Sequence, residues 1–114
     1  MIILIARCEI EPAAVARLQP ILERTMRLTW EESDCLSYSI AVESEAAGVV
    51  TIVERWRSEA ALLAYLATAA MIEFHDALQP ALISLDATIY DVTGERPLPL
   101  PPLSARPVLA LVSG

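Results

Sequence analysis

An alternation of apolar and polar positions in residues 2–10, IILIARCEI, constrains the fold more than any other feature of the sequence. If this segment is extended, one side carries only apolar side chains and the other turns polar at Arg7 and Glu9. The apolar side consists of Ile2, Leu4, Ala6, Cys8 and Ile10. The segment therefore predicts a β-strand with one wholly apolar face.

Three further segments predict strands. Residues 35–43, CLSYSIAVE, and 49–56, VVTIVERW, alternate in the same way, and residues 86–92, DATIYDV, close the pattern. The loop SEAAG between the first two ends in Gly48, which predicts an antiparallel hairpin. In the second strand of this hairpin, one face carries Val50, Ile52, Glu54 and Trp56.

Helices are predicted between the strands. From Pro12 to about residue 30, apolar side chains recur at steps of three and four, which indicates one face of a helix. Pro20 lies inside this segment and lacks the N–H that would bond to Ala16, so we expect a kink or a break there. Ser58 is a suitable N-cap for a helix over 59–67, and Thr68 for a second helix through 79.

The order strand, helix, strand, strand, helix, strand predicts a ferredoxin-like α+β fold (βαββαβ), with a four-stranded antiparallel sheet and helices on one face. The opposite sheet face also bears Ile, Val and Leu, and 55% of the chain is hydrophobic. A chain of 114 residues forms one small domain and cannot bury all of this surface alone. We therefore expect a homodimer in which a second subunit covers the open face.

The charge balance excludes some partners. With 8 basic and 15 acidic residues the net charge is −7, which disfavours a nucleic-acid partner, and the three glycines do not form a phosphate-binding loop.

The cysteines and the apolar runs bear on the location of the protein. Cys8 and Cys35 are not part of a metal-type cluster, and we expect both to be small buried apolar residues in a reducing cytoplasm. No apolar run reaches the roughly 20 residues of a membrane span, and no basic leader precedes the first apolar run. These features predict a cytoplasmic protein without a metal, a membrane or a nucleic-acid partner.

The last part of the chain differs in composition from the rest. Residues 1–94 are predicted to form the domain, whereas residues 95–114 contain most of the eight prolines and are predicted to form an extended arm. The arm ends in VLALV, residues 108–112, a candidate short strand. Such a strand would pair with a sheet edge, including one on the partner subunit, or else the tail lacks fixed structure.

Several motifs resemble the antibiotic biosynthesis monooxygenase domain family. The stretch ESDCLSY enters the second strand, Glu54, Trp56 and Ser58 match the motif that ends the third, and Leu66 and Thr68 match family positions in the following helix. The resemblance covers residues 1 to about 94. It implies a dimer whose two sheets form an α+β barrel, with a pocket between sheet and helices in each subunit. It also implies oxidation of quinols, anthrones or related aromatics by molecular oxygen without metal or flavin.

The sequence departs from the family pattern at several positions. Tyr65 and Ala70 stand where members often have two helical histidines, and the asparagine and tyrosine of anthrone oxygenases are replaced by Ile52 and Leu62. His75 aligns with the iron-ligating histidine of heme-degrading relatives. Their strand asparagine and helical tryptophan, however, correspond here to Arg7 and Tyr65.

Six residues are candidates for a site. His75 and Tyr65 would handle a proton as catalytic residues, while Trp56 and Tyr38 line a cavity and Arg7 and Glu54 orient an anionic substrate. Each also has a structural interpretation. In that interpretation Trp56 and the tyrosines pack in the core, His75 is packed or solvated, and Arg7 and Glu54 neutralise one another across the sheet.

The predicted function is cofactor-independent oxygenation of a quinol-like or phenolic aromatic by a homodimeric monooxygenase. Such chemistry requires few ionisable residues, because the substrate supplies the electrons and the site need only accept a proton and exclude water. Heme binding or degradation is the first alternative. A non-catalytic module that binds a small molecule is the second.

Overall fold

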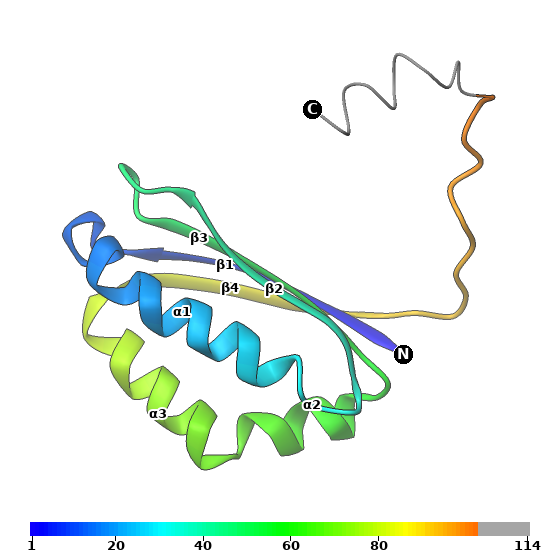
Figure 1. Cartoon of the computed structure of the whole chain (residues 1–114), viewed down its shortest axis with the longest axis horizontal. Coiled ribbons are helices and arrows are strands. Elements are labelled where there is room, and N and C mark those ends of the chain that lie inside the picture. Colours follow the sequence, from blue (N-terminus) through cyan, green and yellow to red (C-terminus); the bar gives the residue numbers. More distant parts are fainter. Residues whose placement is uncertain (103–114) are drawn as a thin grey trace.

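A computed structural model describes residues 1–102 of the chain, so the candidate strand at 108–112 lies outside the described residues. The elements follow the predicted order (Figure 1). They are β1 (Ile2–Ile10), η1 (Pro12–Ala14), α1 (Val15–Thr29), β2 (Cys35–Ser44), β3 (Val49–Trp56), α2 (Glu59–Leu66), α3 (Ala69–Leu78), η2 (Gln79–Ala81) and β4 (Leu82–Asp91). The predicted ferredoxin-like α+β fold is confirmed.

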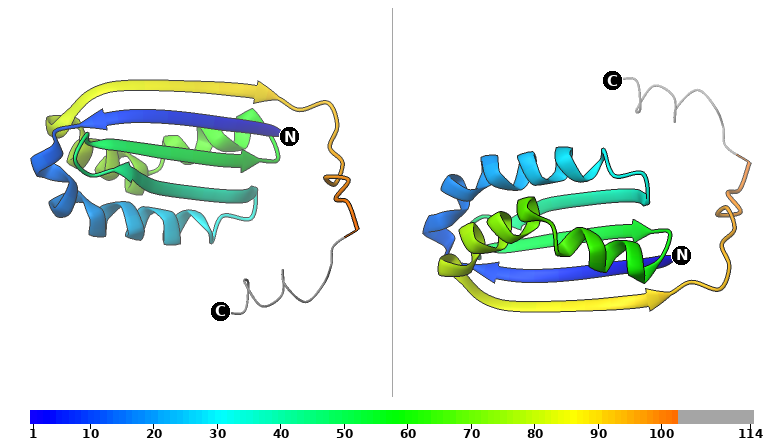
Figure 2. Two further views of the ribbon diagram at one scale, coloured as in Figure 1. Left: turned by 90° about the horizontal axis from the view of Figure 1, so that it is seen from above. Right: turned by 90° about the horizontal axis from the view of Figure 1, so that it is seen from below.

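The four strands form one sheet in the order β2-β3-β1-β4, and every neighbouring pair is antiparallel. All three α-helices lie on the same face of the sheet (Figure 1). Seen from the helix side, α1 runs beside β2, α2 and α3 cross the middle strands, and β4 lies at the edge outside the helices (Figure 2). The helix layer therefore covers only part of the sheet.

The core lies between the helices and the sheet face that the alternation predicted. Its members are apolar side chains from the inner faces of β1, β2 and β3 and from the sheet-facing sides of the helices. The fully buried examples include Ile10, Leu18, Val50, Trp56 and Leu62. Transfer of these side chains from water supplies most of the driving force for folding.

The predicted helix caps are confirmed. The Ser58 side chain accepts a 3.1 Å hydrogen bond from the backbone N–H of Ala61 at the start of α2, and Thr68 accepts from Met71 at the start of α3. Each cap satisfies one N–H group that has no partner inside its own helix. The Thr68 cap explains why α2 and α3 are separate helices.

Helix α1 passes through Pro20 without interruption, so the predicted break does not occur. Pro20 and Ala16 are both exposed, and water can satisfy the Ala16 carbonyl that loses its intrahelical partner. The buried face of α1 retains its contacts with the core. One lost hydrogen bond on the solvent side does not outweigh that packing.

Strand β4 begins at Leu82, four residues earlier than the sequence predicts. Pro80 lies in the short helix η2, after which the chain enters the sheet at once and Leu85 pairs with Cys8 of β1. Residues 82–85, LISL, do not alternate between apolar and polar side chains. Almost the whole of β4 is exposed, so the strand does not need one apolar face to be buried.

Within residues 1–102, no helix covers the other face of the sheet, which we call the open face (Figure 2). Its large apolar side chains Ile5, Val53 and Tyr90 are all exposed.

Among residues 1–102, no single helix is long and apolar enough to cross a membrane. Helices α2 and α3–η2 reach that length and composition only together, and they are bent by 69°.

Candidate functional site

A cavity of about 230 Å³ lies between the sheet and helices α2 and α3. Three of the predicted site residues, Tyr38, Glu54 and His75, border it together. The remaining walls are apolar and comprise Leu4, Ala6, Ile52, Leu66, Met71, Phe74, Leu85 and Ala87. The fold thus places three ionisable side chains from β2, β3 and α3 around one apolar space.

Glu54 is the most unusual of these residues because it is a carboxylic acid in the core, only 6% exposed. The alternation of β3 turns its side chain to the helix-facing side together with Ile52 and Trp56. Trp56 Nε1 donates a 2.8 Å hydrogen bond to Glu54 Oε1. Within the described residues this is the protein donor that holds the carboxyl group, and the cavity borders the same side chain.

Burial raises the pKa of Glu54 above its usual range, while the hydrogen bond from Trp56 lowers it to a smaller extent. Removal of a carboxylate from water disfavours its charged form, and a donor to the carboxylate favours that form. A carboxyl group with a raised pKa in a cavity is a better proton acceptor than an exposed one. This combination is typical of catalytic carboxylates.

Tyr38 pairs directly with Glu54 across β2 and β3 and is also buried. Burial raises the pKa of its phenol, and the nearby Glu54 charge adds to that effect. The phenol therefore keeps its proton and is able to donate a hydrogen bond. Trp30 fixes this part of β2, because its Nε1 donates a 2.7 Å hydrogen bond to the Tyr38 carbonyl.

His75 borders the cavity from α3, but its side chain is exposed. Its ring centroid lies 5.7 Å from that of Phe74, which is buried and forms part of the same wall. His75 therefore lies at the rim of the cavity, in contact with both the apolar space and solvent.

Trp56 and Tyr65 belong to the core rather than to the cavity wall. Their ring centroids are 5.2 Å apart, and both side chains are buried. The Tyr65 hydroxyl forms a short hydrogen bond with Thr29 Oγ1, and Thr29 itself donates to the Thr25 carbonyl at 2.7 Å. Because the single Thr29 hydroxyl proton is used toward Thr25, Tyr65 is the donor of the pair. Its proton is thus committed to a structural contact with α1.

Arg7 does not pair with Glu54, so the predicted neutralisation across the sheet is wrong. Arg7 lies on the open face and forms a 3.0 Å ion pair with Glu43, in which both side chains are about half exposed. Glu54 lies on the helix-facing side of the same sheet. Successive side chains of a strand point to opposite faces, and the two residues fall on opposite faces of the aligned strands.

Much of the cavity wall is formed by Met71, Phe74 and Leu85, which are not among the predicted site residues. The helical spacing of Met71 and Phe74 was a usable signal, because it places both on one face of α3. Nothing in the sequence distinguished Leu85, whose place in the wall depends on its pairing with Cys8.

A second cavity of about 260 Å³ adjoins the first along α3 and β4. It is lined by Cys8, Ile52, Phe74, His75, Leu78, Gln79, Leu82 and Leu85. Burial raises the pKa of the Cys8 thiol, so this cysteine stays protonated and behaves as an apolar wall residue. We call the first space the inner cavity and the second the outer cavity.

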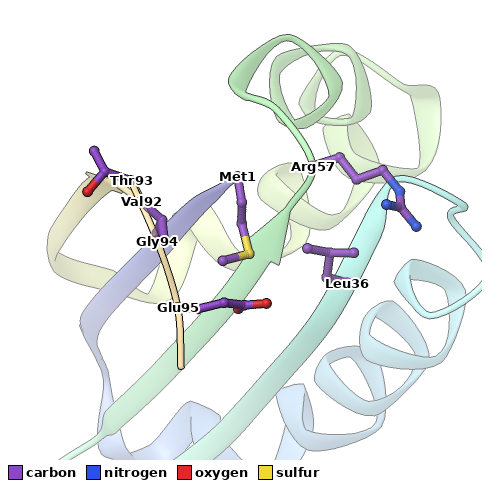
Figure 3. A pocket seen from close by; sticks show the side chains of 7 residues that line it. All are labelled: Met1, Leu36, Arg57, Val92, Thr93, Gly94 and Glu95. Carbon is purple, nitrogen blue, oxygen red and sulfur yellow. The ribbon is translucent and has the colours of Figure 1, made fainter. Parts of the chain in front are cut away.

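A wider hollow of about 520 Å³ lies at the end of the sheet near the N-terminus (Figure 3). Met1, Leu36 and Arg57 border it on one side, and the segment from Val92 to Glu95 that leaves β4 borders it on the other. It includes none of the six predicted site residues. Its charged groups Arg57 and Glu95 are exposed, so it lacks the buried polar group that marks the inner cavity.

The described residues around the two cavities do not form a site for a metal or for heme. Within residues 1–102, no three His, Cys, Asp or Glu side chains come together as metal ligands. Heme would need an axial ligand and cations for its two propionate groups. Within the described part of the chain, the cavity walls offer His75 and the buried carboxyl of Glu54 but no Lys or Arg, and Arg7 lies on the other face. These residues do not fit heme.

Comparison with known proteins identifies the family of the chain. The model of the antibiotic biosynthesis monooxygenase family matches residues 1–77. No curated protein matches the chain.

Solved structures share the fold at low sequence identity. A protein from Deinococcus radiodurans assigned as an antibiotic biosynthesis monooxygenase is 23% identical with a TM-score of 0.77, covering 86% of this chain and 98% of that one. A protein from Mycobacterium tuberculosis is 25% identical with a TM-score of 0.72, covering 82% and 96%. Because the family match spans well over half of the chain, the protein belongs to the antibiotic biosynthesis monooxygenase family.

Proposed function

We propose that the protein is a cofactor-independent monooxygenase that oxidises a quinol-like or phenolic aromatic molecule with molecular oxygen. The observation that carries this proposal is the Glu54 carboxyl group, buried beside an apolar cavity with a raised pKa and held by Trp56. An apolar cavity suits both an aromatic ring and oxygen, and a single proton acceptor is the group that such a reaction needs.

In the proposed reaction, Glu54 accepts the proton of the substrate hydroxyl or of an acidic carbon next to the ring. Tyr38 keeps its own proton and donates a hydrogen bond to the oxyanion that forms. The resulting electron-rich anion then reduces oxygen. In an anthrone the ring CH₂ group becomes C=O, and in a quinol a free ring C–H becomes C–OH while the quinol becomes a quinone. In both cases one oxygen atom of O₂ enters the carbon, the other leaves as water, and all four electrons come from the substrate.

The remaining predicted residues take supporting roles in this proposal. His75 at the rim is the second candidate proton acceptor, because it borders both the cavity and solvent. Trp56 positions Glu54 through its hydrogen bond, and Tyr65 positions Trp56 through ring contact. Arg7 has no role in the chemistry, since it lies on the opposite sheet face.

We further propose that the protein works as a cytoplasmic homodimer in which the open sheet faces pack together. Ile5, Val53 and Tyr90 are large apolar side chains exposed on this face, and a partner sheet would remove them from water. Such packing leaves the helix-facing cavities accessible, because they are lined by residues of the helices and of the other sheet face.

Oxygen uptake with a panel of 1,4-naphthoquinols and anthrones, each corrected for its spontaneous oxidation, tests the proposal. We expect turnover by the natural protein and a loss of about 10²- to 10⁴-fold in kcat for Glu54→Gln. Glu73→Gln is the matched control, because Glu73 is exposed on α3 and outside both cavities. Absence of enzymatic turnover with every substrate would contradict the proposal. A Soret band on adding hemin, lost in His75→Ala, would favour the heme alternative instead.

A further inference from the structure

The inner and outer cavities share a wall. Four residues, Ile52, Phe74, His75 and Leu85, border both spaces. Each cavity alone is smaller than the roughly 300 Å³ at which small-molecule sites usually begin, whereas the two together exceed that size. The two spaces therefore adjoin along α3 and β4, and we call them together the groove and the four shared residues its waist.

The two ends of this groove differ in chemistry. The inner end holds Glu54 and Tyr38, the two buried groups able to exchange a proton or donate a hydrogen bond. The outer end adds Cys8, Leu78 and Leu82, with Gln79 as its one added amide. Apart from Gln79 and the shared His75, this end presents only aliphatic side chains, the Phe74 ring and a protonated thiol, so it suits hydrocarbon better than a charged or hydroxylated group.

The position of β4 explains why the outer end is open. The strand lies outside the helix layer (Figure 2), and its large apolar side chains Leu85 and Ile89 are exposed. Leu85 is 58% exposed although its partner Cys8 on the same sheet face is buried. Ile89 continues the same row toward the other end of the strand, opposite Leu4. An apolar row beside a reactive carboxyl is typical of a site that buries an apolar ligand.

We infer that the substrate of this site is a phenolic or quinol ring that carries an apolar side chain. The ring lies in the inner cavity beside Glu54 and Tyr38, and the chain passes the waist at Phe74 and His75 into the outer cavity. This inference rests on the proposed function for the reaction, but the binding of the chain is a separate property of the groove.

Binding can be measured without turnover. We would titrate 2-alkyl-1-naphthols, with chains of one to five carbons, into the anaerobic protein. Each methylene buried in the outer cavity should tighten the Kd about fourfold. The corresponding 2-alkyl-1,4-naphthoquinols should show a parallel rise in kcat/KM in air.

Variants that fill the outer cavity provide the sharper test. Leu82→Trp, and independently Leu78→Trp, should abolish the gain with chain length while the one-carbon ligand keeps its affinity within about twofold. Leu63→Trp is the matched control, because Leu63 is exposed on α2 away from both cavities, and it should keep the full gain. Circular dichroism verifies that each variant is folded.

The outcomes separate this inference from the proposed function. Affinity independent of chain length in the natural protein overturns the outer subsite, even if short quinols are oxidised. An equal gain with chain length in the filled variants and the control also overturns it, because the chain then binds elsewhere. Chain-dependent binding without any oxygen uptake supports the subsite and refutes the monooxygenase proposal.

Discussion

Glu54 and Trp56 lie two residues apart on one face of β3, and the indole N–H of Trp56 donates a 2.8 Å hydrogen bond to the Glu54 carboxylate. The tryptophan that ends the strand is therefore both a core residue and the support of the candidate proton acceptor. This relationship explains why a large aromatic residue stands where β3 gives way to α2. It also makes the ionisation of Glu54 sensitive to a residue outside the cavity.

Substitution of Trp56 by Phe should raise the pKa of Glu54 further, because it removes the donor that favours the carboxylate. The lower limb of the pH–rate profile should move to higher pH, and kcat should fall at pH 7. Trp30→Phe serves as control, since Trp30 bonds to the backbone of β2 rather than to Glu54. An unchanged profile in Trp56→Phe would show that this hydrogen bond does not tune the site.

Glu54→Gln should make stability less dependent on pH. The folded state raises the pKa of Glu54, so it binds more protons than the unfolded state, and the free energy of unfolding falls as pH rises through this window. Glutamine lacks that charge but can still accept from Trp56. We expect the stability of Glu54→Gln relative to the natural protein to rise as the pH increases through and above the ordinary titration range of glutamate. Urea unfolding at several pH values measures this difference.

The adjacent leucines of α2 should differ sharply in their tolerance of truncation. Leu62 is fully buried, and Leu62→Ala should lower the free energy of unfolding by about 2 to 5 kcal/mol. Leu63 is 54% exposed, and Leu63→Ala should change it by less than about 0.5 kcal/mol. Equal effects in urea unfolding would mean that α2 packs on the sheet through a different face.

The hairpin between β2 and β3 should tolerate no side chain at Gly48. This residue has φ +69°, and an added Cβ would lie 2.0 Å from the backbone oxygen of Ile10. Gly48→Ala should therefore cost more than about 1 kcal/mol, since β1 or the hairpin must shift. Gly94→Ala, whose Cβ would meet nothing within 4 Å, is the control and should leave the Tm unchanged.

A charge on the open sheet face should prevent dimerisation. Val53→Lys and Ile5→Asp each place an ionised group where the proposed partner sheet would bury it. In sedimentation velocity at low micromolar concentration, both variants should shift from dimer to monomer. Ile72→Asp, an exposed position on α3, should remain dimeric. A natural protein that is monomeric in this experiment would refute the proposed assembly.

Local signals in the sequence were sufficient for the elements of the fold. Ser58 and Thr68 predicted both helix starts, and the alternation around Ile10 and Ile52 predicted which sheet face is buried. The wrong predictions concern positions where packing elsewhere in the chain outweighs a local preference of the sequence. Pro20 does not interrupt α1, because the buried face of the helix is unaffected by a carbonyl lost on its exposed side.

The candidate site was only partly predictable. The alternation already placed Arg7 with Glu9 on the polar face and Glu54 with Ile52 on the apolar face, so the error about their pairing was avoidable from the sequence. The different surroundings of Tyr38 and Tyr65 could not be predicted from the sequence. One borders the cavity and the other is bonded to Thr29, thirty-six residues away in the chain.

The sequence by itself determined the order of strands and helices, their caps and their buried faces, because these depend on side chains within one or two turns of each other. Only the tertiary structure decided that Glu54, Tyr38 and His75 meet at one cavity and that β4 lies outside the helix layer. Both depend on strand register and helix placement across the whole chain, since a shift of one residue in register turns every side chain to the other face.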